Sequence, residues 1–184
     1  MGLDIYINDI VKSTEKLNII LFADDSCLYH SNSNTNNLIN IVNNELNQVN
    51  TWLTSNKLTL NVNKSHYIIF SRRLKEPQNI QSIKINKNNL EQVNETKFLG
   101  LILQSNMKWD KHIQILSNKI SKYSSILFQI RDSLDSHSLK LIYYALIYSN
   151  LTYMNIIWGK SPQQHLQPLI IAQKRTIRTI KFRN

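Results

Sequence analysis

The sequence predicts an α+β fold in residues 1–104, followed by an all-helical region in residues 105–184. Hydrophobic residues make up 42% of the chain, which is enough for a packed core. The apolar pattern changes from short runs to helical spacing near residue 105. The charge changes at the same place: residues 1–104 hold 10 Lys+Arg and 9 Asp+Glu, whereas residues 105–184 hold 12 and 3. Two independent signals therefore agree on one boundary.

The first region begins with Ile5–Val11, which is typical of the last turns of a helix. The apolar run Leu17–Ala23 predicts a buried strand, and Ser26–His30 can return beside it as a second strand. A long amphipathic helix follows, which Asn34 or Thr35 can cap. Its apolar positions recur in steps of three and four and form one stripe: Leu38, Ile41, Val42, Leu46, Val49, Trp52 and Leu53.

Three more strands complete this region. They are expected at His66–Phe70, Ile80–Ile85 and Thr96–Leu103, with turns at Pro77 and at Asn86–Asn89. Together with the earlier strands they predict an antiparallel sheet with helices.

The second region shows the helical period throughout. A first helix is predicted from Trp109 onward, a second over Leu139–Ile147 that runs on towards Trp158, and a third over Leu166–Lys181. The first of these has apolar residues in unbroken steps of three and four: Ile113, Leu116, Ile120, Tyr123, Leu127, Ile130 and Leu134.

Composition excludes several classes of protein. The longest purely apolar run, Ile19–Ala23, is too short to cross a bilayer, and the N-terminus has no features of a secretory signal. The single cysteine, Cys27, rules out an intramolecular disulfide and a zinc site built on cysteines. The net charge of +10, concentrated in the second region, favours a polyanionic partner over a generally cationic soluble surface.

Asp24 and Asp25 follow the apolar run at the expected tip of the first hairpin. Two carboxylates held together repel each other unless they share a proton or a cation. A hard ion such as Mg²⁺ takes oxygen ligands, and a pair of such ions can serve nucleotidyl transfer. The alternative is an ordinary turn, because aspartate is common in turns.

The predicted last helix carries a basic face. Lys174, Arg178 and Lys181 are spaced four and three residues apart, so they share one side. Such a face can meet phosphates without reading sequence, or it can simply be solvated. Another side of the helix is apolar and can pack inward: Leu169, Ile170, Ile177 and Ile180.

Several segments in register resemble reverse transcriptases of LINE-type (non-LTR) retrotransposons, over about residues 3–184. Phe22-Ala23-Asp24-Asp25 resembles the F/Y-x-D-D signature of that family. The other matching segments are Tyr6–Ile10 (YINDI), Trp52–Asn61 (WLTSNKLTLN), Lys64-Ser65, Phe70, Lys97–Leu101 (KFLGL), Trp109 with His112-Ile113, Tyr153, Trp158-Gly159, and Gln173–Arg175 with Ile177-Arg178.

The resemblance implies a partial palm followed by a helical thumb that grips RNA template and RNA–DNA or DNA duplex. It implies that Asp24 and Asp25 bind Mg²⁺, two ions in the complete enzyme, and that Lys64 belongs to the motif proposed to protonate the pyrophosphate. Phe98, Leu99 and Gly100 would lie in the primer-grip hairpin. The thumb contacts would come from the basic residues of the last helix: Lys174, Arg175, Arg178 and Lys181.

Two parts of the family's catalytic core have no counterpart here, namely an upstream metal-binding aspartate and a Gln-Gly-Ser segment. We therefore expect the chain alone to have no measurable polymerase activity. Three readings follow: a fragment of a longer enzyme, a stand-alone nucleic-acid-binding protein, or a relic of a decayed element. By resemblance the protein acts in the nucleus or cytoplasm and at no membrane.

Overall fold

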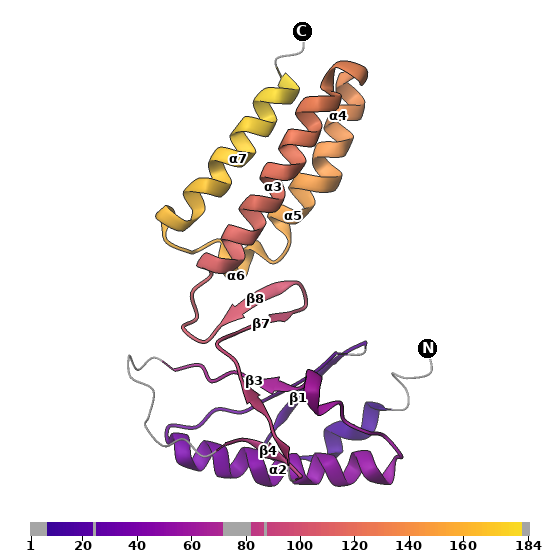
Figure 1. Cartoon of the computed structure of the whole chain (residues 1–184), viewed down its shortest axis with the longest axis vertical. Helices are drawn as coiled ribbons and strands as arrows, with labels where there is room; N and C mark the ends of the chain where they lie inside the picture. The colour runs from indigo at the N-terminus through magenta and orange to yellow at the C-terminus, as the bar shows by residue number, and fades with distance from the viewer. Residues whose placement is uncertain (1–6, 24, 72–81, 87, 182–184) are drawn as a thin grey trace. The chain divides into compact units, whose positions relative to one another are not determined.

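A computed structural model describes residues 7–23, 25–71, 82–86 and 88–181 (Figure 1). The chain divides into two compact units, Met1–Asn94 and Glu95–Asn184. Helices and strands are mixed, as the predicted α+β class requires, whereas the assignment to palm and thumb stays a prediction. The hairpin formed by residues 95–104 belongs to the second compact unit, where β8 contacts the first long helix, and the division into domains near residue 104 stays a prediction. No helix in the described part of the chain is long and apolar enough to cross a membrane.

The first unit opens with a 3₁₀ helix, η1 (Asn8–Ser13), and a hairpin of β1 (Asn18–Phe22) and β2 (Asp25–Tyr29). The two predicted strands are confirmed, and they pair antiparallel with Phe22 opposite Asp25. The helix expected over Ile5–Val11 is a short 3₁₀ helix instead, and its first two residues lie outside the described part.

The long helix α2 (Thr35–Ser55) confirms the prediction. The side chain of Asn34 caps it by accepting bonds from the amides of Asn36 and Asn37. The most deeply buried position is Ile39, which the predicted stripe omitted, at 1% exposure. The helix covers a core to which loops and short strands contribute: Leu17, Ile39, Leu46, Ile83 and Ile85.

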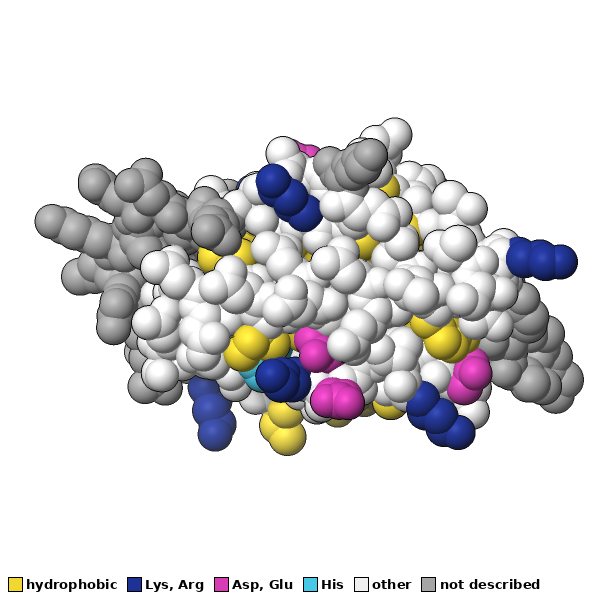
Figure 2. Space-filling view, turned by 90° about the horizontal axis from the view of Figure 1, so that it is seen from below, with side chains coloured by type: hydrophobic (Ala, Val, Ile, Leu, Met, Phe, Trp, Pro, Cys, Tyr) yellow, Lys and Arg dark blue, Asp and Glu magenta, His cyan; other side chains and the backbone are white. Residues whose placement is uncertain are grey.

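The exposed face of α2 is almost entirely uncharged. Figure 2, which looks at this face of the unit, shows mostly uncharged polar side chains and backbone, with scattered charges of both signs. Side-chain amides make up this face: Asn36, Asn37, Asn40, Asn44, Asn47 and Gln48. Because amides carry no net charge, this face offers little electrostatic attraction to phosphates.

The rest of the unit consists of short elements: η2 (Val62–Lys64), β3 (His66–Tyr67), β4 (Lys84–Ile85), β5 (Asn88–Asn89) and β6 (Glu91–Gln92). β4 and β5 form an antiparallel pair around a turn in which Asn86 has φ +55°, as the asparagine-rich turn predicted. β3 and β6 pair in parallel. The strands expected over 66–70 and 80–85 are thus much shorter, and Pro77 lies outside the described residues.

The second unit starts with the hairpin of β7 (Glu95–Phe98) and β8 (Leu101–Gln104). The prediction of a single strand over Thr96–Leu103 was wrong, because this range forms two strands joined by a turn. Leu99 and Gly100 both have positive φ, +46° and +82°. Two such residues make the tight turn that joins antiparallel strands, so the chain reverses in the middle of the apolar run.

Helices form the remainder of this unit: α3 (Asp110–Ile130), η3 (Arg131–Ser133), α4 (Ser136–Tyr143), the π-helical η4 (Tyr144–Tyr148), α5 (Ser149–Thr152), α6 (Asn155–Trp158) and α7 (Gln163–Lys181). Figure 1 shows α3, α4–α5 and α7 side by side, and α7 packs along α3. Ile120, Leu127, Leu139 and Ile147 lie fully buried between them.

The helix predicted to run on towards Trp158 is interrupted. Tyr153 is extended, and Met154 adopts a left-handed conformation with φ +47° before α6 begins. The apolar period continues through this break, so the residue pattern contains no sign of it.

Candidate functional site

Asp25 lies at the tip of the β1–β2 hairpin, where it is the first residue of β2 and is exposed. Asp24 lies outside the described residues. The strand β1 ends at Phe22, and the next residue, Ala23, has φ +51°. An alanine in the left-handed region costs about 1–2 kcal/mol, a strain tolerated in tight hairpin turns and at functional sites.

One face of this hairpin is apolar and solvent-exposed. Cross-strand partners share a face, so Ile20 and Phe22 lie with Cys27 and Asp25, and Tyr29 continues the row. Ile20, Phe22 and Tyr29 are 45%, 60% and 52% exposed. The expectation of a buried strand is therefore wrong for this face, although partial burial still raises the pKa of the Cys27 thiol.

The described residues contain no group of three or more His, Cys, Asp and Glu that could hold a metal ion. Asp25 is thus the one member of the predicted metal site that can be placed. The metal and catalytic roles of Asp24 and Asp25 stay predictions.

A buried acid secures the segment that leads into this hairpin. Glu45, on α2, is 5% exposed, and its Oε2 accepts hydrogen bonds from the backbone amides of Glu15 and Lys16 at 2.9 and 3.0 Å. The hydrogen bond from the Lys16 amide lowers the pKa of the Glu45 carboxyl, and the bond from Glu15 adds a smaller effect in the same direction. Burial opposes both by raising the pKa. Glu45 was not predicted as a buried residue, because an acid on the apolar stripe of a helix looks like a break in the pattern.

The segment Trp52–Asn61 forms the end of α2 and the chain that leaves it. Lys57 takes φ +58° just after the helix, and the Leu58 amide donates back to the carbonyl of Leu53 at 2.8 Å. This geometry closes the helix. Lys64, the predicted proton donor, ends η2 with its side chain exposed, and its role stays untested.

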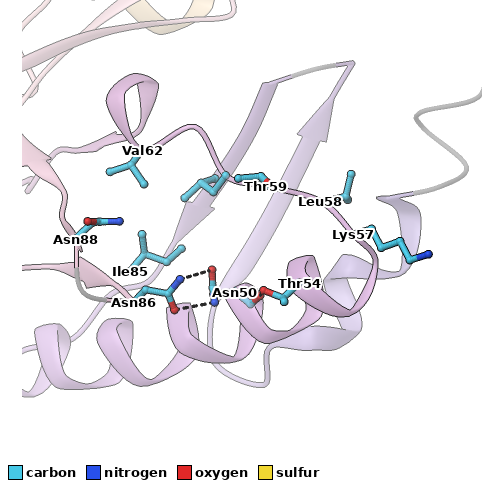
Figure 3. A pocket seen from close by; sticks show the side chains of 10 residues that line it. Asn50, Thr54, Lys57, Leu58, Thr59, Val62, Ile85, Asn86 and Asn88 are labelled. Carbon is cyan, nitrogen blue, oxygen red and sulfur yellow. Dashed lines mark hydrogen bonds between the residues drawn. The ribbon is translucent and has the colours of Figure 1, made fainter.

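A small cavity of about 340 Å³ opens beside this segment (Figure 3). The side-chain amides of Asn50 and Asn86, which line it, donate one hydrogen bond to each other, at 2.8 and 3.1 Å. Each amide uses one N–H donor and one oxygen lone pair in this pair, which is half of its hydrogen-bonding capacity.

The hairpin predicted to hold the primer, residues Phe98, Leu99 and Gly100, is clamped by Tyr153. The Tyr153 hydroxyl donates to the Leu99 carbonyl at 2.7 Å. A Cβ on Gly100 would lie 3.3 Å from Cε1 of the same ring. Glycine is therefore required twice at position 100, by its positive φ and by this close contact.

A chain of contacts continues from Tyr153 to β8. The Tyr153 carbonyl accepts from Nε1 of the buried Trp158 at 3.0 Å. The Trp158 ring lies 5.9 Å from the His112 ring, and His112 Nδ1 accepts from the Ile102 amide at 3.4 Å. Burial lowers the pKa of His112, which favours the neutral ring that can accept this bond.

Three segments that resembled the family separately thus meet in one network: the hairpin, the Trp109–His112 stretch and the Tyr153–Trp158 stretch. Gly159 belongs to the same corner, since its amide donates to the Asn155 carbonyl at 2.7 Å. A Cβ on Gly159 would lie only 2.5 Å from that oxygen. These residues fix the turn of the hairpin against the helices.

A basic groove of about 760 Å³ lies between α3 and α7. From α7 it is lined by Lys174, Arg175 and Arg178, three of the four predicted contact residues, and all three are exposed. The fourth, Lys181, ends α7, but its side chain lies outside the described part. The described residues that line the groove include no acid.

The groove wall opposite α7 contains two residues that were not predicted to line it, Phe128 and Arg131. Arg131, at the end of α3, places its guanidinium carbon 4.1 Å from the ring centroid of Phe128. Phe128 lies outside the predicted apolar stripe and is 53% exposed, whereas the neighbouring Leu127, which belongs to the stripe, is fully buried. Arg131 lies far from the α7 cations in the sequence, so no sequence pattern indicated that they line the same groove.

The inward face of α7 differs in part from the prediction. Leu169 is buried as expected, but Ile177 is 43% exposed and Thr176 is fully buried in its place. The Thr176 hydroxyl donates to the Ala172 carbonyl at 3.0 Å, which satisfies its polar group inside the core.

Comparison with known proteins agrees with the motif resemblance. A family model described as reverse transcriptase (RNA-dependent DNA polymerase) matches residues 3–103. The probable RNA-directed DNA polymerase from transposon X-element of Drosophila melanogaster is 23% identical over 165 residues, which is 86% of this chain and 18% of that protein. The chain therefore spans less than a fifth of its relative's length. No solved structure matches the chain significantly.

Proposed function

Because the chain belongs to the reverse transcriptase (RNA-dependent DNA polymerase) family, we propose that it forms the palm and thumb part of a LINE-type retrotransposon polymerase. The observation that carries this proposal is the match over residues 3–103, which includes the hairpin that bears Asp24 and Asp25. The reaction is RNA-directed DNA synthesis, in which the primer 3′ hydroxyl attacks the α-phosphorus of a nucleotide and pyrophosphate leaves.

The carboxylates suit the ions that this chemistry uses. Asp25 offers hard oxygen ligands at an exposed hairpin tip, where an ion and a substrate can reach them. Asp24 and Asp25 would hold Mg²⁺, which when bound activates the primer hydroxyl and stabilises the leaving group. Lys64, exposed at the end of η2, would supply a proton to the pyrophosphate.

Primer extension on an RNA template tests this proposal, with the full reading frame that encodes this chain. We expect Mg²⁺-dependent extension that falls at least about a hundredfold in Asp24→Asn and Asp25→Asn, since each removes charge stabilisation of the transition state. Asp9→Asn, in the 3₁₀ helix η1, is the matched control and is expected to keep full activity. Undiminished extension by both hairpin variants would refute the assignment.

The α3–α7 groove supports a nucleic-acid contact in this same role. Its three α7 cations are exposed, and the described residues that line the groove include no acid. Phosphate contacts of this kind hold duplexes without regard to sequence. We infer that Lys174, Arg175, Arg178 and Arg131 grip the template–primer duplex, with Lys181 as a further contact.

Binding of a fluorescent RNA–DNA duplex separates this role from that of a merely solvated basic face. The double charge reversal Lys174→Glu with Arg178→Glu is expected to weaken binding at least tenfold at low salt, because attraction becomes repulsion. The control reverses two exposed lysines of the other unit, Lys12→Glu with Lys57→Glu. Equal effects of both pairs would show that net charge, and not the groove, governs binding.

A further inference from the structure

The groove between α3 and α7 holds an aromatic side chain that phosphate binding does not need. Phe128 is 53% exposed and lines the groove, whereas its neighbour Leu127 is fully buried. An exposed phenyl ring on a helix gains little from the hydrophobic core. Its position on the groove wall opposite three α7 cations therefore calls for a ligand with an apolar or π surface.

Arg131 changes what this ring can recognise. Its guanidinium carbon lies 4.1 Å from the Phe128 ring centroid, well within the range of a cation–π contact. The neighbouring carboxylate of Asp132 lies 3.7 Å from its Nε and is highly exposed, so that ion pair is weak. The ring and the cation thus form one pre-arranged platform with both stacking capacity and positive charge.

The size and chemistry of the groove fit a nucleotide rather than a phosphate alone. About 760 Å³ falls within the roughly 300–1,000 Å³ typical of sites for small organic ligands. Lys174, Arg175 and Arg178 face the platform across this space. Phosphate groups need only the cations, so the rest of the groove volume and the Phe128 ring are available to a nucleotide base.

We propose that this groove binds an unpaired nucleotide, whose base stacks on Phe128 and Arg131 while the α7 cations hold its phosphates. The inference deepens the nucleic-acid role proposed for the groove and rests on it. Inside a duplex both faces of a base are already stacked, so only a single strand, an overhang or an end can offer a free face. The groove therefore prefers nucleic acid with unpaired bases, and it does so without sequence specificity, because every base has a π-face.

The test uses the whole chain with 2-aminopurine as a reporter, since stacking quenches its fluorescence. One probe is a single strand with 2-aminopurine, the second an RNA–DNA duplex with a 2-aminopurine overhang, and the third a blunt duplex of the same length. We expect quenching on binding for the first two. Phe128→Ala should weaken their binding about five- to a hundredfold, the range found for loss of one stacked base.

Two matched variants make the result specific. Phe128→Tyr keeps the ring and should retain quenching and affinity. Ile126→Ala removes a side chain that is 48% exposed on the same helix but does not line the groove, and it should change neither. Blunt-duplex affinity should stay within about twofold in Phe128→Ala, because its phosphate contacts are intact.

The outcomes separate this inference from the proposal beneath it. Duplex binding without Phe128-dependent quenching, or equal weakening of blunt duplex and single strand, overturns the stacking platform alone. No binding of any probe overturns the nucleic-acid role of the groove and the platform with it.

Discussion

A single buried carboxylate connects the long helix of the first unit to the segment before the aspartate hairpin. Glu45 accepts two backbone amides, from Glu15 and Lys16, and so satisfies donors that would otherwise lie unpaired next to the core. Hydrogen bonds to charged groups contribute about 1.5–3 kcal/mol each when they are well formed. Such a contact positions the approach to β1 without touching the reacting groups.

Glu45→Gln should therefore lower the free energy of unfolding by about 1–3 kcal/mol at pH 7. The pKa of Glu45 is lowered in the folded state, so its contribution is fully present above the pKa of the unfolded chain and is lost as pH falls through the folded pKa. Urea unfolding between pH 3 and 7 measures this contribution. The pH-dependent part of the free energy of unfolding that comes from Glu45 should be absent in Glu45→Gln. Glu91→Gln, at the exposed strand β6, serves as the control; an equal loss there would contradict the assignment.

Gly100 is the second residue whose identity the backbone dictates. Gly100→Ala should destabilise the protein by about 1–2 kcal/mol from its positive φ alone, with an additional cost from the contact with Tyr153. Thermal unfolding of Gly100→Ala alone and in a Tyr153→Ala background separates the two terms. The cost should be smaller in the double variant, and an unchanged cost would show that the ring adds nothing.

At the scale of elements, the hairpin β7–β8 is held by a residue from a distant break between helices. Tyr153 reaches the hairpin because Met154 interrupts the helical run with its left-handed conformation. The hairpin turn, which Leu99 and Gly100 make, is thus also held by a residue from the helical part of the same unit.

Tyr153→Phe removes only the hydroxyl that donates to Leu99. We expect a loss of about 0.5–1 kcal/mol and faster hydrogen exchange of the amides of β7 and β8, with α7 unchanged. Tyr148→Phe, on an exposed stretch of η4, is the control. Uniformly faster exchange across the unit would point to global destabilisation instead of a local clamp.

The long helices and the β1–β2 hairpin could be predicted, whereas the shorter strands of the chain could not, for a physical reason. Over about 20 residues, α2 and α3 repeat the 3.6-residue period many times, so a few deviations such as Glu45 do not hide it. β7 and β8 have four residues each, and their apolar run continues through the turn. Only the backbone at Leu99 and Gly100 reverses the chain, and a lone glycine is a weak signal for that.

For the molecule as a whole, the sequence located the excess charge but not the surface it creates. The count of 12 basic against 3 acidic residues in 105–184 identified the basic region, and the spacing on α7 identified two of the groove's cations, Lys174 and Arg178. Arg131 and Phe128 could not be assigned to it, because only the packing of α3 on α7 brings them together. The aspartate pair was recognised by its motif, a signal that packing could not have supplied.

This charge distribution makes a quantitative prediction about salt. If the four cations that line the groove neutralise about four phosphates, log K for duplex binding should fall with log salt concentration with a slope of roughly −3. Lys174→Gln should make the slope less steep by roughly 0.7–0.9, because one fewer counterion is released. Lys12→Gln, in the near-neutral unit, should leave the slope unchanged. Fluorescence anisotropy measures the slopes from roughly 50 to 300 mM salt, a range that spans physiological ionic strength. A slope near zero, or the same change in both variants, would mean that contacts other than phosphates in this groove dominate binding.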